Sequence, residues 1–405
     1  MKPLFTLALL LCLITIPVFG QTVIDTEEDD RFPGLPYYSY GSGLGMTTPD
    51  STYQMNIRFR VQSRATFSDY ENSDPVIEGV VRRLRLRFDG FVGDPRFLYA
   101  IQLSFAPGDV GQLTEGQNIN IIRDAMLYYR PNRHWNIGFG QTKLPGNRQR
   151  VNSSGALQLT DRSINNAQFT IDRDFGLQVY FLNEDPDEFS FNIKTAVSNG
   201  EGRNWTQNPD LNLAYTGRLE IMPLGSFLRG GMFFEGDLAR EQTPKLLLGG
   251  TYHFNSQAQR SGGQTGTQLF SQRDLTSILL DAMFKFRGFA YQGAWMNRVT
   301  DNPLTFNPNN PSETRFVFAG EGMDHQMSYL SPIDVELVAR YSIQTPQSSL
   351  ANRIPEREQY TLGITKYIWE HSLKLQLEGT YDKRTFSNNS TNDGYYVRFQ
   401  VELGI

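Results

Sequence analysis

Apolar and polar residues alternate strictly in many segments of this chain. Between Tyr53 and Gln62 every odd position is apolar and every even position is polar or charged. A similar alternation, in which small residues replace some of the polar ones, recurs at residues 83–89, 97–105, 135–139, 189–198, 373–381 and 397–405. Successive side chains of a β-strand point to opposite faces, so this pattern predicts strands with one apolar face. Repeated alternating segments of about ten residues are typical of a transmembrane β-barrel, which is apolar toward lipid and polar toward its lumen.

The links between these segments alternate in length, as the turns and loops of a bacterial barrel do. Short turns lie near residues 93–95, 131–133, 184–186, 287–288, 331–332 and 369–370. Longer links lie near residues 68–78, 106–117, 144–171, 199–210, 256–273, 300–313, 343–356 and 385–393. Eight long links predict eight hairpins and therefore an all-β antiparallel barrel of 16 strands. We interpret residues 222–243 as an extended periplasmic connection, because a strand at 227–238 would make the count odd.

The first twenty residues have the features of a secretory signal peptide. Lys2 precedes an apolar run from Leu4 to Phe19, and the small residue Gly20 precedes the expected cleavage site. We therefore predict a signal peptide at 1–20, an irregular periplasmic leader at 21–50 and a barrel domain at 51–405. The one cysteine, Cys12, lies in the signal peptide, so the mature chain would have neither disulfides nor cysteine metal ligands.

Composition changes this picture little. The mean hydropathy of −0.42 is that of a soluble protein, but a barrel exposes only every second strand residue to lipid. The formal net charge of −5 argues against general nucleic-acid binding. A soluble β-sandwich also alternates, with its polar face toward water. The secretion signal, the chain length and the alternation that reaches the last residue favour the barrel.

Arginine recurs on the polar face of the first two predicted strands. The six positions are Arg58, Arg60, Arg64, Arg83, Arg85 and Arg87. An arginine facing lipid would cost about 2–4 kcal/mol at mid-membrane, so these side chains are expected in the lumen. Clustered positive charge there would favour anions, and guanidinium matches carboxylate and phosphate geometry. In the alternative interpretation the arginines pair with Asp89, Asp124 and Glu220 and brace the wall. The two interpretations can both hold.

The longest predicted outer link runs from Lys143 to Arg173. It carries the basic residues Lys143, Arg148, Arg150 and Arg162 and several apolar residues, including Leu157, Leu159, Ile164 and Phe169. Apolar residues in a loop indicate packing rather than free exposure to solvent. A loop folded into the lumen would narrow the pore and bring its basic residues to the constriction. The alternative is an ordinary external loop.

Several segments resemble the phosphate-selective porins of the O and P type, in the branch found in Bacteroidetes. The resemblance is strongest at Gly140–Arg150, and it also includes Gly43–Ser51, Arg83–Gly90, Asp161–Ser163 and Asp172–Gly176. It implies an outer-membrane barrel of about sixteen strands in a Gram-negative cell, usually a homotrimer, with the third outer loop folded inward and an arginine-lined path for anions. Family members that prefer phosphate carry a lysine cluster near the constriction. Here only Lys143 and Lys194 are nearby.

Other classes of function have less support. The four histidines are scattered, and neither an H-E-x-x-H nor a G-x-S-x-G motif occurs. We therefore expect no enzyme activity, metal or cofactor. We expect a passive porin for small anions, phosphate or other oxyanions among them, embedded in outer-membrane lipid. The alternative is a barrel with a closed lumen that serves as a receptor or as a subunit of a surface complex, with 222–243 as a plug or docking segment.

Overall fold

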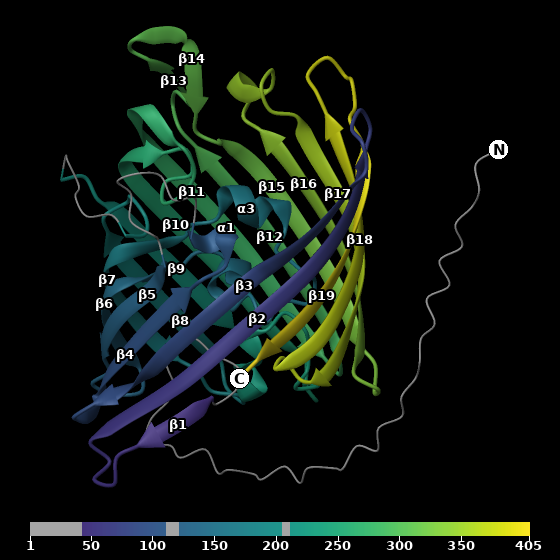
Figure 1. Cartoon of the computed structure of the whole chain (residues 1–405). Helices are drawn as coiled ribbons and strands as arrows, with labels where there is room; N and C mark the ends of the chain where they lie inside the picture. Colours follow the sequence, from purple (N-terminus) through teal and green to yellow (C-terminus); the bar gives the residue numbers. More distant parts are fainter. Residues whose placement is uncertain (1–42, 111–120, 205–210) are drawn as a thin grey trace. The chain divides into compact units, whose positions relative to one another are not determined.

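The structure is a computed structural model that describes residues 43–110, 121–204 and 211–405. The predicted signal peptide and the predicted leader as far as residue 42 lie outside the described residues. The chain divides into two units, Met1–Pro33 and Gly34–Ile405, and the description below concerns the second. This unit is a closed antiparallel β-barrel (Figure 1).

Sixteen strands form the wall, as the sequence predicts. They are β2 (Tyr53–Tyr70), β3 (Val76–Val92), β4 (Asp94–Ser104), β5 (Ile122–Tyr129), β6 (Trp135–Lys143), β7 (Arg173–Asn183), β8 (Ser190–Ser198), β9 (Ala214–Met222), β10 (Lys245–Arg260), β11 (Gln268–Phe286), β12 (Phe289–Val299), β15 (Gly320–Leu330), β16 (Val335–Pro346), β17 (Glu356–Trp369), β18 (Leu373–Thr385) and β19 (Gly394–Gly404). Each pairs with the next in this order. β19 pairs with β2 from Gly394↔Tyr70 to Gly404↔Arg60 and closes the barrel, which leaves no open edge in the wall.

A short extra strand, β1 (Leu44–Thr47), extends this closure. β19 ends opposite Arg60, whereas β2 begins at Tyr53, so part of the β2 edge has no partner in β19. β1 pairs with that edge, from Leu44↔Ile57 to Thr47↔Gln54. Unpaired backbone groups in a membrane are costly, which explains why this segment is a strand. It lies within the stretch that the sequence predicts to be irregular.

The alternation in the sequence becomes an inside and an outside of the barrel. On β18, Leu377 and Tyr381 are 48% and 44% exposed, whereas Gln376 and Glu378 are each 2% exposed. Apolar side chains therefore cover the outer face, and polar side chains crowd the inside. A soluble β-sandwich has the opposite arrangement, with an apolar interior. The β-sandwich alternative is wrong.

The connections follow the predicted short and long order with one difference. The first outer link spans only residues 71–75, because β2 and β3 stay paired as far as Ser68↔Val76. The link after β12 carries a small hairpin of β13 (Leu304–Asn307) and β14 (Asn310–Phe316).

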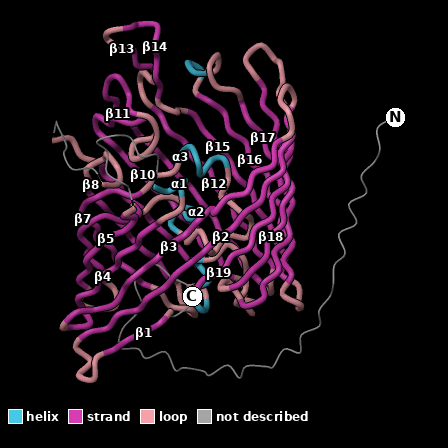
Figure 2. Tube along the Cα trace, in the orientation of Figure 1, coloured by secondary structure: helices cyan, strands magenta, loops and turns pink. Residues whose placement is uncertain are grey.

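The helices are short and lie in the links (Figure 2). They are α1 (Pro107–Val110), α2 (Arg148–Val151), α3 (Ile164–Phe169), η1 (Leu228–Phe233) and η2 (Ser348–Leu350). Within 43–110, 121–204 and 211–405, no helix is both long and apolar enough to span a membrane.

Candidate functional site

Residues 144–172, the link between β6 and β7, cross the interior of the barrel; we call them the inward loop. Its Thr160 binds Glu378 of β18, with the backbone N and the hydroxyl each 2.9 Å from a carboxylate oxygen. Its Asn165 donates to Asp324 of β15 at 2.9 Å. Both partners belong to strands that are not neighbours of β6 or β7 in the wall. The loop is therefore attached to wall strands remote from its own.

Lumen side chains satisfy the backbone of the inward loop. Lys374 Nζ donates to the carbonyls of Gly155 and Leu157 at 2.7 and 2.6 Å. Arg298 donates to the carbonyls of Gln168 and Thr170 at 2.8 and 3.2 Å. Buried carbonyls without donors would cost free energy. The apolar residues that predict packing in this loop are all buried, namely Leu157, Leu159, Ile164 and Phe169. Phe169 forms a cluster with Leu144 and Ile171 of the loop and with Leu279 and Met296 of the wall.

The connection between β9 and β10, residues 223–244, also enters the barrel; we call it the periplasmic segment. It contains η1 and no β-strand, which confirms that it is a connection and not an additional strand. Lys285 Nζ donates to its carbonyls at Gly231, Phe234 and Gly236, at 2.7, 3.0 and 2.6 Å. Its Glu235 accepts from the backbone N of Gln158 in the inward loop at 2.9 Å. The two inserted segments therefore contact each other inside the barrel.

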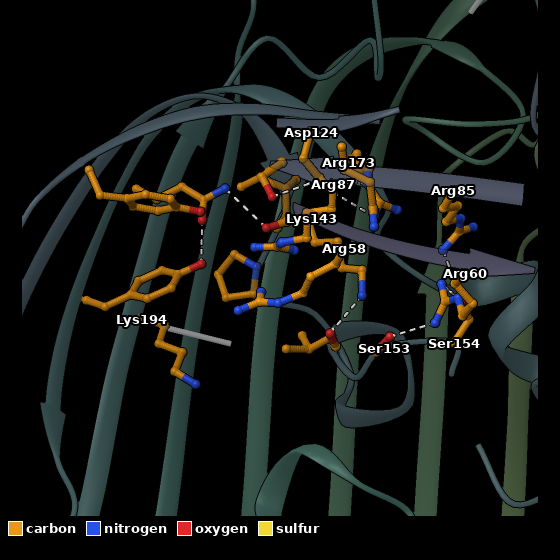
Figure 3. A pocket seen from close by; sticks show the side chains of 18 of the residues that line it. Arg58, Arg60, Arg85, Arg87, Asp124, Lys143, Ser153, Ser154, Arg173 and Lys194 are labelled. Carbon is orange, nitrogen blue, oxygen red and sulfur yellow. Dashed lines mark hydrogen bonds and ion pairs between the residues drawn. The ribbon is translucent and has the colours of Figure 1, made fainter. Parts of the chain in front are cut away.

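A cavity of about 100 Å³ remains beside these segments (Figure 3). Its wall residues come from β2 to β9 and from Ile405 after β19, and the inward loop contributes the other side. The charged residues that line it are Arg58, Arg60, Arg85, Arg87, Lys143, Arg173, Lys194, Arg218, Asp124 and Glu220. We call the part of the barrel that carries these residues the arginine wall. This cavity thus lies against a strongly cationic part of the barrel.

Two cross-strand pairs of arginines form the centre of this wall. Arg58 faces Arg87, and Arg60 faces Arg85, in the register of β2 and β3. Arg58 and Arg87 share the Asp89 carboxylate at 2.7 and 2.9 Å. Facing like charges on neighbouring strands destabilise a sheet unless counter-groups are present. Asp89 therefore stabilises one of the two pairs directly.

The second pair binds hydroxyls of the inward loop. Arg60 donates to Ser153 and Ser154, each at 2.9 Å. Arg85 donates to the same Ser154 hydroxyl at 3.0 Å and to Asp109 of α1 at 3.0 Å. Two guanidiniums thus converge on one neutral oxygen, that of Ser154. These contacts also attach the loop to the arginine wall.

Single carboxylates serve several cations at once. The donors to Asp161 of the inward loop are Arg64 at 3.1 Å, Arg82 at 2.8 Å and Arg83 at 2.9 Å. Burial opposes ionisation of Asp161, but the guanidiniums of Arg83, Arg82 and Arg64 outweigh it and hold the pKa of this carboxyl well below its usual range. Such sharing leaves a local excess of positive charge.

Glu220 of β9 is shared in the same way. It binds Arg148, Lys194 and Arg218, the last two at 2.7 and 2.8 Å. Asp89, Asp124 and Glu220, the carboxylates that the sequence suggests as partners, all accept from basic side chains. Pairing and excess positive charge therefore occur together.

The candidate residues from the sequence divide into two groups. Six line the cavity: Arg58, Arg60, Arg85, Arg87, Lys143 and Lys194. The other five hold the inward loop in place, namely Arg64, Arg83, Arg148, Arg150 and Arg162. Arg150 pairs with Asp172 at the end of the loop. Arg162 donates to the carbonyls of Gln149 and Asn152 at 2.7 and 2.9 Å.

Sequence reasoning missed several basic residues of the lumen. Arg82 has the wrong parity for an inward position, but a β-bulge after Gln62↔Arg83 shifts the register, and both Arg82 and Arg83 bind Asp161. Arg218 lies on β9 in the alternating run Ala214–Met222, so the pattern used for the first two strands would have identified it. Among the described residues no group of histidine, cysteine and carboxylate side chains is arranged to hold a metal ion.

Comparison with known proteins agrees with this architecture. Residues 55–226 match the family model described as phosphate-selective porin O and P. The outer membrane channel DcaP of Acinetobacter baumannii superposes with a TM-score of 0.56 at 13% identity, covering 89% of this chain and 99% of that chain. OmpF of Salmonella typhi, solved in complex with daunomycin, has a TM-score of 0.53 at 11% identity, covering 88% of this chain and 100% of that chain. At such identities these structures show the fold alone. The comparison with curated proteins found no match.

The matched residues include the arginine wall and the inward loop. They contain most of β2, all of β3 to β9, both arginine pairs and the whole inward loop. The match and the barrel fold together identify an outer-membrane channel rather than an enzyme. Residues 55–226 of this channel are similar to the phosphate-selective porin O and P family.

Proposed function

We propose that this channel conducts small anions by passive diffusion, phosphate and other oxyanions among them. The observation that carries the proposal is the charge of the cavity lining, where eight cationic side chains accompany the two carboxylates Asp124 and Glu220. Positive side chains along a narrow aqueous path lower the energy of anions and raise that of cations. A passive pore needs no cofactor and forms no covalent intermediate.

The residues proposed to line the path and bind anions are those of the cavity and the loop. They are Arg58, Arg60, Arg64, Arg83, Arg85, Arg87, Lys143, Arg148, Arg150, Arg162 and Lys194. Guanidinium groups replace part of the hydration of an oxyanion with paired N–H donors. The residues that line the cavity would contact the anion. The others would act through the position of the inward loop.

The test is ion selectivity in a planar lipid bilayer. Under a potassium chloride gradient, the reversal potential of the purified protein should indicate anion preference, and Arg85→Gln and Arg87→Gln should weaken it. Arg96→Gln is a matched control, because Arg96 lies at the exposed start of β4 and pairs with Asp94 there. A reversal potential that indicates cation preference, or one unaffected by the Arg85 and Arg87 variants, would contradict the proposal.

One observation favours the closed-lumen alternative. Both the inward loop and the periplasmic segment occupy the interior, and Glu235 joins them. A barrel sealed in this way would serve as a receptor or as a subunit of a surface complex. No ion current from correctly folded protein would support this alternative over the channel.

We also propose a homotrimer embedded in outer-membrane lipid, with a mature chain that begins at Gln21. The trimer is supported by the resemblance to the family, and the lipid by the apolar outer face of the barrel. Native electrophoresis before and after heating would show whether a trimer dissociates. N-terminal sequencing of exported protein would test both the cleavage site and the signal peptide at 1–20.

A further inference from the structure

The cavity beside the inward loop has two chemically different sides. The β2–β3 side carries the arginine pairs Arg58–Arg87 and Arg60–Arg85. The inward loop contributes Leu144, Pro145 and Val151 to the same cavity. The rings of Tyr128 and Tyr180 add further apolar surface from β5 and β7. Figure 3 shows the four arginines close to Ser153 and Ser154 of the inward loop.

Inorganic phosphate does not match both sides. A fully hydrated oxyanion needs donors or water on all of its faces, and aliphatic surface supplies neither. Apolar surface becomes favourable when it covers an apolar part of a ligand. A ligand with an anionic group at one end and an apolar body at the other would use both sides of this cavity.

The anionic end has a defined place in the structure. Arg60 and Arg85 both donate to Ser154 Oγ, at 2.9 and 3.0 Å. Arg85 also binds Asp109 through its other terminal nitrogen at 3.0 Å, and Arg60 lies 4.0 Å from Glu402. The two nitrogens that meet at Ser154 bind only a neutral hydroxyl there, so an incoming carboxylate would replace a weaker acceptor at this point. Hydrogen bonds to an ionised acceptor are about twice as strong as those between neutral groups. The two oxygens of a carboxylate can accept from both guanidiniums together.

We propose that this cavity is a binding site for small organic carboxylates with an apolar body, a single aromatic ring for example, and that it binds them in preference to inorganic phosphate. The carboxylate lies on Arg60 and Arg85 in place of the Ser154 hydroxyl. The body packs on Val151, Pro145 and the tyrosine rings. The proposal rests on the proposed function, because the ligand reaches the cavity through the channel.

Block of the chloride current in a planar bilayer tests the preference. Benzoate, acetate and phosphate are added separately to the purified full chain, and the half-blocking concentration of each is measured. Each buried methylene changes affinity about fourfold, so benzoate should block at a concentration at least about tenfold below that of acetate. The half-blocking concentration of benzoate should also be lower than that of phosphate. Equal or stronger block by phosphate would overturn the proposal and leave anion conduction intact.

Variants locate the site. Val151→Ser should raise the half-blocking concentration of benzoate about fourfold or more and leave that of acetate unchanged. Ser154→Asp places a fixed carboxylate on Arg60 and Arg85 and should abolish the benzoate effect. Val76→Ser is the matched control, because Val76 is 55% exposed at the outer end of β3 and is not part of the cavity lining. Unchanged block in both cavity variants would refute the site.

A direct measurement separates this proposal from the proposed function. Calorimetric titration of benzoate into detergent-solubilised protein reports the site whether or not current flows. Binding that Ser154→Asp abolishes supports the site even if the channel carries no anion current, and in that case only the proposed function fails. Absence of heat, together with absence of block, overturns the site.

Discussion

Asp161 is the single side chain that best tests how the inward loop is held. Its carboxylate accepts from the guanidiniums of Arg64, Arg82 and Arg83. Its backbone carbonyl accepts from Arg340 of β16 at 3.1 Å. Asp161→Asn keeps the size of the side chain and removes its charge. Three cations of β2 and β3 would then lose their shared counter-ion.

The expected loss follows from the burial of this group. The Asp161 side chain is 22% exposed, while those of Arg64 and Arg83 are 9% and 3% exposed. Removal of one partner from a buried ion pair destabilises by about 3–5 kcal/mol. Because Asp161 is partly exposed, we expect Asp161→Asn to lower the free energy of unfolding by an amount near the lower end of this range, about 3 kcal/mol. The lost negative charge also makes the lumen more positive.

Two assays measure these effects. Limited proteolysis of folded protein should cut the inward loop faster in Asp161→Asn, and the reversal potential should shift further toward anion preference. Asp94→Asn is the matched control. The Asp94–Arg96 pair is exposed at the start of β4, so its loss should change neither the proteolysis rate nor the reversal potential. Unchanged proteolysis and unchanged selectivity in Asp161→Asn would refute this account of the attachment.

The remaining predictions concern acid, the periplasmic segment, the lipid face and one glycine. Because the pKa of Asp161 is held well below its usual range, this carboxylate stabilises the folded loop fully above about pH 3.9, and the stabilisation is lost as the pH falls through the folded pKa. Faster proteolysis of the loop at a pH still above about 3.9 would contradict this. Lys285→Met leaves three carbonyls of the periplasmic segment without their donor, so conductance should rise; equal conductance would show that the segment does not limit the path. Leu127 is 66% exposed on the outer face, so Leu127→Arg should destabilise the barrel by about 2–4 kcal/mol in refolding assays, whereas Leu127→Ile should not. Gly140 has φ 131°, and an added Cβ would overlap the Ala125 carbonyl oxygen; Gly140→Ala should lower the thermal midpoint, while Gly79→Ala, which meets nothing, should not.

The strand pattern was predictable because a barrel wall is a local structure. Each residue faces lipid or lumen according to its position in its own strand, so the alternation at Tyr53–Gln62 already contains the direction of every side chain. Turn lengths add the number of strands. The predicted inward direction of Arg58, Arg60, Arg85 and Arg87 follows from the same parity and agrees with the structure.

Irregularities in the pairing of neighbouring strands could not be predicted from the alternation of residues and the link lengths. The bulge at Gln62↔Arg83 gives Arg82 an inward position against its parity. The β1 strand exists because β19 ends opposite Arg60 and leaves part of the β2 edge unpaired. Both features depend on how two strands meet, and neither strand shows them alone.

The chain by itself determined a sixteen-strand barrel with an arginine-rich inner face, since both features follow from parity and link length. The tertiary structure alone decided which arginines line the open space and which hold the inward loop. Arg83 and Arg85 have the same parity on one strand, yet one binds Asp161 and the other reaches Ser154 and Asp109 in the cavity region. That difference depends on where residues 144–172 cross the lumen, and it arises from contacts with strands far away in the sequence.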